Sequence, residues 1–356
     1  MVFLVLAAFA LRKVRICARE LRCMPRSFPA RSWFGVVLII FLMATRSASG
    51  LTIDFDYTYD TNGFFTANPQ AKTLLNDAAE VFENRLSDSL SAITPGTEGS
   101  ITDTWTTDAF NPSDPSNASA NITVTDLSIA ANTIIIYVGG TTSLSGSELG
   151  LGGFGGENSS GTTNWNNTVQ ARGQTGALSA TPTDFGPWGG SIAFSSTAAW
   201  YFDTGTFANN AFASNAVPGG EFDFFSVATH ELGHVLGIGT APSFQDKIVS
   251  GNFTGTNATR ILGHNPVLSP DMGHWAEGTM SDAWGTNVGQ EVAMDPTLID
   301  GTRKYFTTLD AAGLEDVGWQ VALVPEPTVW PWAAAMGATS AITWRKKRQR
   351  VRRAIA

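Results

Sequence analysis

Cysteine is scarce in this sequence: the 356 residues include two, Cys17 and Cys23. Both precede an apolar run at 33–44, so a chain that lost its first 50 residues would contain no cysteine. Such a chain cannot form a disulfide bond, which excludes a small fold held together by disulfides. The remaining length is sufficient for one large or two small domains that are stabilised by a hydrophobic core.

The first 50 residues have the order of a secretory signal. The run 33–44 follows a series of arginines and is followed by Ser47-Ala-Ser-Gly50, a stretch of small residues suited to cleavage. We therefore expect residues 1–50 to be a signal or leader region, with Met1 or Met24 as its start. A retained membrane helix is the alternative, but the run is short for a span, which needs about 20 residues.

Basic residues are also scarce in the part between the two ends. Residues 51–323 contain seven Lys and Arg against 29 Asp and Glu, a net charge of −22. A body this acidic repels phosphate backbones and anionic membrane surfaces, so we expect no nucleic-acid binding. Solubility outside the cell accounts for the acidity. Calcium sites are compatible with it, although no particular ligand set can be assigned.

The C-terminal apolar segment is interrupted rather than continuous. Residues 324–350 consist of Val324-Pro-Glu-Pro327, an apolar stretch at 328–344 and the basic cluster 345–350. This order resembles the PEP-CTERM sorting signal of Gram-negative bacteria. The resemblance implies transient membrane anchoring, recognition and cleavage by an exosortase-type sorting machinery, and a final location in the cell envelope, on the cell surface or outside the cell. A plain tail anchor is the alternative, but the prolines and glycine within the stretch argue against a permanent one.

One short motif carries recognisable chemistry. His230 and His234 are four residues apart within the apolar stretch 225–237, so on a helix they lie on one face, where two imidazoles can bind one metal ion. Glu231 lies beside them. In H-E-x-x-H helices that bind zinc, this carboxylate is the general base that takes a proton from a water molecule acidified by the metal.

The motif extends in a way that resembles one protein family. The metzincin metallopeptidases share H-E-x-x-H-x-x-G-x-x-H, and four positions here match it: His230, Glu231, His234 and Gly237. Gly237 allows the chain to leave the helix sharply. Thr240 replaces the third histidine. The resemblance to the matrixin and leishmanolysin branches implies a zinc metallopeptidase domain at 51–323 of the α+β class, with a twisted mixed sheet, an active-site helix and a smaller C-terminal subdomain.

The third zinc ligand must therefore come from another segment. After a long insertion at 240–271, the sequence Met272-Gly-His-Trp-Ala-Glu277 resembles the element with which leishmanolysin-like metzincins deliver their third histidine. This resemblance favours His274. His264 and Asp271 are the alternatives, because both residue types bind zinc.

Two further segments support the resemblance. Residues 291–296 are similar to the metzincin Met-turn, in which a methionine, here Met294, lies beneath the zinc ligands. Residues 307–319 resemble the C-terminal helix of that family. We also expect 189–194, with 200–202, to be the edge strand beside the active-site helix, to which an extended substrate peptide adds.

The remaining elements are predicted from periodicity and composition. Alternation predicts a strand at 51–57, apolar residues at helical spacing predict an amphipathic helix at 69–86, and a continuous apolar run predicts a central strand at 132–138. Polar and small residues predict loops at 102–120 and a glycine-rich surface excursion at 139–176.

These patterns favour an exported zinc endopeptidase that acts on a protein or peptide substrate. The alternative from a different class is a surface binding or adhesion protein that keeps a metzincin-like scaffold with weak or no turnover, an idea motivated by Thr240 and by the loops rich in Asn, Thr and Gly. A glutamate retained beside the metal argues against that alternative, because a buried carboxylate without a role is costly. A purely structural zinc site would have four protein ligands.

Overall fold

The computed structural model describes residues 50–203 and 216–321. The predicted leader and the segment that resembles a sorting signal lie outside these ranges. Within them, no helix is long and apolar enough to span a membrane.

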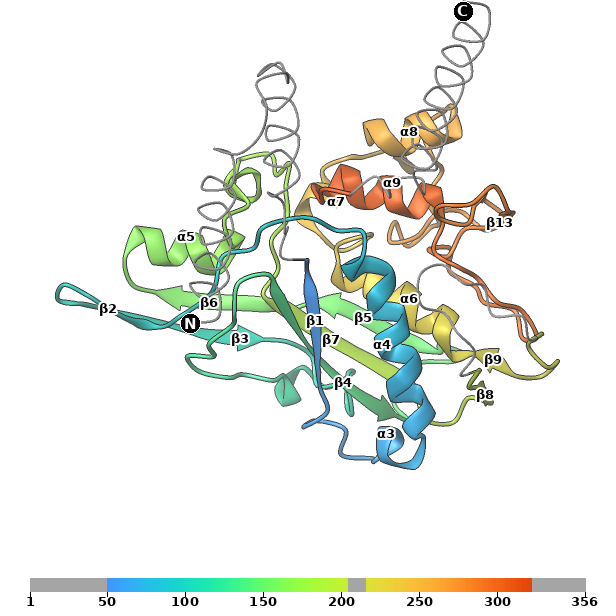
Figure 1. Cartoon of the computed structure of the whole chain (residues 1–356), viewed down its shortest axis with the longest axis horizontal. Helices are drawn as coiled ribbons and strands as arrows, with labels where there is room; N and C mark the ends of the chain where they lie inside the picture. Colours follow the sequence, from blue (N-terminus) through green and yellow to red (C-terminus); the bar gives the residue numbers. More distant parts are fainter. Residues whose placement is uncertain (1–49, 204–215, 322–356) are drawn as a thin grey trace, which may run out of the picture. The chain divides into compact units, whose positions relative to one another are not determined.

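A four-stranded mixed sheet forms the centre of the fold (Figure 1). Its strand order is β1 (Thr52–Asp56), β4 (Thr133–Thr141), β7 (Gly189–Ser195) and β5 (Gly150–Phe154). β1, β4 and β7 are parallel, whereas β5 is antiparallel to β7 and lies at the edge. The predicted strands at 51–57 and 132–138 are confirmed, and β4 is central as expected. The protein is therefore of the α+β class, with an open twisted sheet.

β4 contributes buried side chains to both faces of the sheet. Ile134, Ile136 and Val138 belong to one buried cluster, while Ile135 and Tyr137 belong to another on the opposite face. Alternate residues of a strand point to opposite faces, so a strand covered on both sides is apolar throughout. This explains why the run had no polar alternation.

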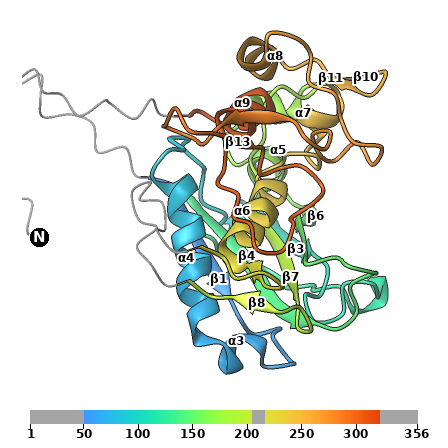
Figure 2. The same ribbon diagram turned by 90° about the vertical axis from the view of Figure 1, so that its right-hand side faces the viewer.

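The first of these faces is covered by α4 (Pro69–Glu83) and α6 (Phe224–Val235), which lie side by side (Figures 1 and 2). The predicted amphipathic helix is confirmed, since Leu74, Leu75 and Phe82 are fully buried. The other face is covered by the sheet β2 (Gly96–Glu98), β3 (Ile101–Asp108) and β6 (Gly156–Ser160), and by α5 (Thr163–Ala171).

Three predictions about the less apolar segments are wrong. The expected loop at 102–120 contains β3, whose alternate residues Asp103, Trp105 and Thr107 are buried, because threonine is a good strand former even where it makes the pattern look polar. The expected surface excursion at 139–176 contains β5, β6 and α5. The segment expected at the edge of the sheet, 189–194, is the interior strand β7, and the edge strand is β5.

The chain after α6 packs onto the first core cluster. The insertion expected at 240–271 contains α7 (Pro242–Gln245), the hairpin β10 (Ile248–Val249) and β11 (Asn252–Phe253), and α8 (Thr256–Leu262). The hairpin β12 (Met280–Asp282) and β13 (Gly289–Glu291) and helix α9 (Thr308–Val317) follow, so the predicted C-terminal helix is confirmed. In Figure 2 these helices lie at one end of α6. The remaining short elements are α3 (Phe64–Ala67), β8 (Trp200–Tyr201), β9 (Phe222–Asp223), η2 (Ala118–Ala120) and η3 (Thr175–Leu178).

Candidate metal centre

Helix α6 is fixed at its start by side chains and at its end by the backbone. At its start, Asp223 accepts hydrogen bonds from the backbone N–H (3.0 Å) and the hydroxyl (2.7 Å) of Ser226, and Arg303 donates to the same carboxylate at 2.7 Å. This is an N-cap, reinforced by a buried ion pair. At its end, Gly237 has a φ of 107°, and the N–H of Ile238 donates to the carbonyl of Gly233 at 3.0 Å. The predicted sharp exit at Gly237 is confirmed.

The structure brings three histidines together, two from α6 and one from the segment after the insertion. The Nε2 atoms of His230 and His234 are 3.1 Å apart, and that of His274 is 3.1 Å from the first and 3.0 Å from the second. These three residues form a group that could hold a metal ion. His274 is thus brought to the site as expected from the sequence.

The hydrogen bonds of the other ring nitrogens determine the tautomers. Nδ1 of His230 lies 2.7 Å from the carbonyl of Ala293, and Nδ1 of His234 lies 2.8 Å from the carbonyl of Ile238. A carbonyl can only accept, so both Nδ1 atoms carry hydrogen and both Nε2 atoms of the neutral rings have a free lone pair. Burial, followed by the neighbouring imidazoles, lowers the pKa of His230 well below its usual range and that of His234 to about 4.

The third imidazole is oriented by a carboxylate. Nδ1 of His274 lies 3.0 Å from Oδ2 of Asp271, a contact that directs its Nε2 towards the other two rings. Nitrogens bound to one zinc ion at about 2.0–2.1 Å are about 3.3 Å apart in tetrahedral geometry. The observed separations are slightly shorter than this distance, and facing lone pairs need a cation between them. The donor set can therefore hold a metal ion.

The residues considered as alternative ligands have other roles. His264 is exposed, and its Nδ1 lies 3.0 Å from the carbonyl of Asn265, outside the cluster. Asp271 orients His274 instead of joining the group of ligands. Thr240, which stands where the family pattern has a histidine, donates its hydroxyl to the carbonyl of His234 at 2.6 Å.

Glu231 lies in the protein interior between α6 and the edge strand. Only 5% of its surface is exposed, and a Cβ added to Gly150 on β5 would lie 2.5 Å from its Oε1. Burial raises the pKa of Glu231 to about 8, the N–H of Gly152 acts in the opposite direction, and the charge of Glu148 raises it further. The glycines of β5 thus let the strand lie directly against the carboxylate, a role that composition alone did not indicate.

Met294 lies against the same helix. It is fully buried, and a Cβ on Gly233 would lie 2.5 Å from its sulfur. Gly233 lies between the two histidines in α6, so the methionine is packed beneath that stretch, as predicted. Its neighbour Ala293 provides the carbonyl that orients His230. Backbone acceptors of this kind leave no residue signature in a sequence.

Asp310, a buried carboxylate that the sequence analysis missed, connects the segment that carries His274 with the segment that carries Met294. Asp310 of α9 accepts from the indole N–H of Trp275 (2.8 Å) and from the N–H groups of Ala293 (3.0 Å) and Met294 (3.3 Å). It also accepts from the N–H (2.8 Å) and hydroxyl (2.7 Å) of Thr307. The spacing Thr-x-x-Asp at the start of α9 was the available signal, since it forms a capping box.

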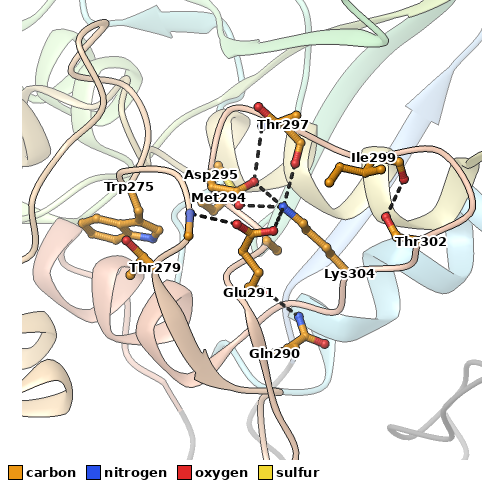
Figure 3. Close-up of polar contacts among 12 residues, drawn as sticks. Trp275, Thr279, Gln290, Glu291, Met294, Asp295, Thr297, Ile299, Thr302 and Lys304 are labelled. Carbon is orange, nitrogen blue, oxygen red and sulfur yellow. Dashed lines mark hydrogen bonds and ion pairs between the residues drawn. The ribbon is translucent and has the colours of Figure 1, made fainter.

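A second acidic group surrounds Lys304. Carboxylate oxygens of Glu277, Glu291 and Asp295 lie within 4.8 Å of one another, and Figure 3 shows the contacts of Glu291 and Asp295 with the ammonium of Lys304. The ammonium of Lys304 lies 2.6 Å from both oxygens of Asp295, 2.8 Å from Glu291 and 2.6 Å from the carbonyl of Thr297. A lysine therefore supplies the positive charge for this group, and it gives no support for a calcium site.

Comparison of the chain with protein families, with curated proteins and with solved structures gives no match. The functional argument therefore rests on the geometry of the site.

Proposed function

We propose that this protein is an exported, zinc-dependent endopeptidase. The observation that carries the proposal is that three imidazole Nε2 atoms lie 3.0–3.1 Å from one another, each ring being oriented through its Nδ1. Two of these rings are on the helix that also carries the buried Glu231. Three nitrogen ligands with a carboxylate nearby are typical of catalytic zinc sites, whereas structural sites have four protein ligands.

His230, His234 and His274 would hold the metal. Zinc bound by these residues would supply Lewis-acid chemistry: it would lower the pKa of a water molecule to about 7 and polarise a carbonyl group. Glu231 takes the proton on a carboxylate oxygen and delivers it to the nitrogen of the leaving amine. The carboxylate is buried on the helix that carries two of the ligands, which keeps it positioned for this proton transfer.

The edge strand offers a place for the substrate backbone. Among the described residues, β5 is paired on one side only, with β7, and it lies against Glu231. An extended peptide that pairs with β5 satisfies its own backbone groups and brings its carbonyl carbons near the zinc ligands. In this proposal β5 takes the role that the sequence analysis gave to 189–194.

Export and sorting are part of the proposal. The leader at 1–50 directs export, and the segment at 324–350 provides transient anchoring for an exosortase-type machinery. A chain that lacks 324–356 is therefore expected to appear in the culture medium, which fractionation followed by immunoblotting measures. If the shortened chain stays in the envelope to the same extent as the full chain, the sorting proposal is wrong.

The catalytic proposal is tested on the full chain purified in mild detergent. We expect about one zinc ion per chain, as a three-histidine site requires, and cleavage of an unfolded protein that stops with a chelator and returns with zinc. Glu231→Gln keeps the three ligands and should retain zinc while losing about 100-fold or more in cleavage rate. Zinc binding by the wild type without any cleavage would instead favour the binding or adhesion protein.

A further inference from the structure

Glu148 lies two residues before the edge strand β5, whose first residue, Gly150, lies against Glu231. Its neighbour Leu149 already pairs with the sheet, since its carbonyl accepts the N–H of Ser195 at 2.9 Å. Alternate residues of an extended chain share a face, and Gly150, two residues on, faces Glu231. Glu148 therefore lies two residues along the chain from the part of β5 that contacts the carboxylate of Glu231.

Glu148 is exposed and carries no cationic partner in the described part of the chain. One oxygen accepts the N–H of Ser145 at 3.0 Å, a contact within its own turn. The ion pairs found in residues 50–203 and 216–321 involve other carboxylates. The carboxylate of Glu148, next to the strand with which a substrate peptide is proposed to pair, is thus available to a cationic side chain of that peptide.

In residues 50–203 and 216–321, each of the seven Lys and Arg side chains contacts a group other than Glu148. Arg85 and Arg172 are buried and donate to backbone carbonyls. Lys304, whose charge acts on His230, is bound to Asp295 and Glu291. The exposed carboxylate of Glu148 is therefore a local negative charge, which attracts cationic side chains and repels anionic ones.

We propose that Glu148 is a specificity-determining residue that selects a lysine or arginine side chain next to the cleaved bond, so that the substrates are basic polypeptides. This inference rests on the proposed peptidase function and deepens it. An ion pair in open water contributes little, but a peptide that pairs with β5 excludes water from the contact and strengthens it. We expect a preference of about tenfold in kcat/KM for lysine over glutamine at one substrate position.

The first test compares peptides that differ only in having Lys, Gln or Glu at each position around the bond. The zinc-loaded wild type should prefer Lys about tenfold at one position and disfavour Glu there. Glu148→Gln should remove the preference, and Glu148→Lys should reverse it in favour of Glu. The matched control is Glu98→Gln, which removes one exposed carboxylate from β2 and should leave the preference unchanged. A lysine preference that persists in Glu148→Gln, or that is absent from the wild type, overturns the inference.

The second test measures recognition without turnover. Glu231→Gln protein, loaded with zinc, is titrated with a fluorescent basic peptide and with its glutamine counterpart, and anisotropy reports the two Kd values. We expect tighter binding of the basic peptide, lost when Glu148→Gln is added and reduced by salt. If the wild type cleaves no peptide while binding to the Glu231→Gln protein still depends on Glu148, the peptidase function is refuted but recognition by Glu148 is supported. Equal Kd values for the two peptides would refute that recognition whether or not peptides are cleaved.

Discussion

Asp310→Asn should lower both the stability of the fold and the affinity for the metal. The carboxylate of Asp310 has five donors, two on Oδ1 and three on Oδ2. Whichever way the asparagine amide is turned, its NH2 group faces backbone N–H donors that have lost their acceptor. Each such loss costs about 1–3 kcal/mol, so we expect a decrease of about 2–4 kcal/mol in the free energy of unfolding.

The effect on the metal follows from where these donors lie. Ala293 provides the carbonyl that orients His230, and Trp275 is the neighbour of His274, so displacement of either one moves a ligand. Loss of such supporting contacts commonly lowers metal affinity about 10–100-fold, and we expect at least tenfold here. Denaturant titration of the apo protein and competition with a zinc chelator measure the two quantities, under conditions in which every variant is folded.

The same helix supplies the control. Asp316 is also largely buried and accepts from the N–H groups of Asn257 (2.9 Å) and Ala258 (2.8 Å), so it caps α8 and contacts no residue of the metal centre. Asp316→Asn should lose about 1–3 kcal/mol without a change in zinc affinity. If the two variants lose zinc affinity equally, Asp310 does not position the ligands and the reasoning fails.

Three further predictions follow from single sites. His274→Ala should lose zinc and activity together, whereas His264→Ala should change neither; the opposite result would reassign the ligand. Gly239→Ala places a Cβ against the carbonyl oxygen of the segment that carries His274, so zinc affinity should fall, whereas Gly263→Ala, with a similar positive φ and open space around it, should leave zinc binding intact. Burial raises the pKa of Asp88 to about 6, so the folded state binds more protons than the unfolded state between about pH 4 and 6, and stability is lost as pH rises through that window. Asp88→Asn should therefore stabilise the protein at pH 7 by about 1–2 kcal/mol and have little effect at pH 3.5, as denaturant titration at the two pH values will show.

The parts of the fold and site that could be predicted depend on local spacing. His230 and His234 share a helix face because they are four residues apart. α4 was evident from the helical spacing of its apolar residues and β4 from its continuous apolar run. His274 could be selected because Trp275 follows it, and that tryptophan is fully buried in the structure. Each of these signals is contained in a short segment of chain.

The parts that could not be predicted depend on contacts between distant segments. β5 has the sequence of a loop, because its glycines are selected by the close approach of Glu231 rather than by strand propensity. Whether β5 or β7 lies at the edge depends on strand order, which the strands themselves do not encode. The carbonyl acceptors of the imidazoles can come from any residue type, and Asp310 could be recognised as a helix cap but not as the acceptor for two other segments.

The insertion after α6 explains how a ligand so distant in sequence reaches the site. Trp275 packs against Phe244 of α7 and Phe253 of β11, with ring centroids 5.9 and 5.4 Å away, and those two rings stack on each other at 4.3 Å. The insertion therefore builds the apolar pocket that holds the neighbour of His274. A third ligand at position 240 would need no such pocket, since the helix exit itself would place it. In this chain Thr240 instead donates a hydrogen bond to the carbonyl of His234 at the end of the helix. The third ligand, His274, is positioned by the aromatic cluster that holds its neighbour Trp275.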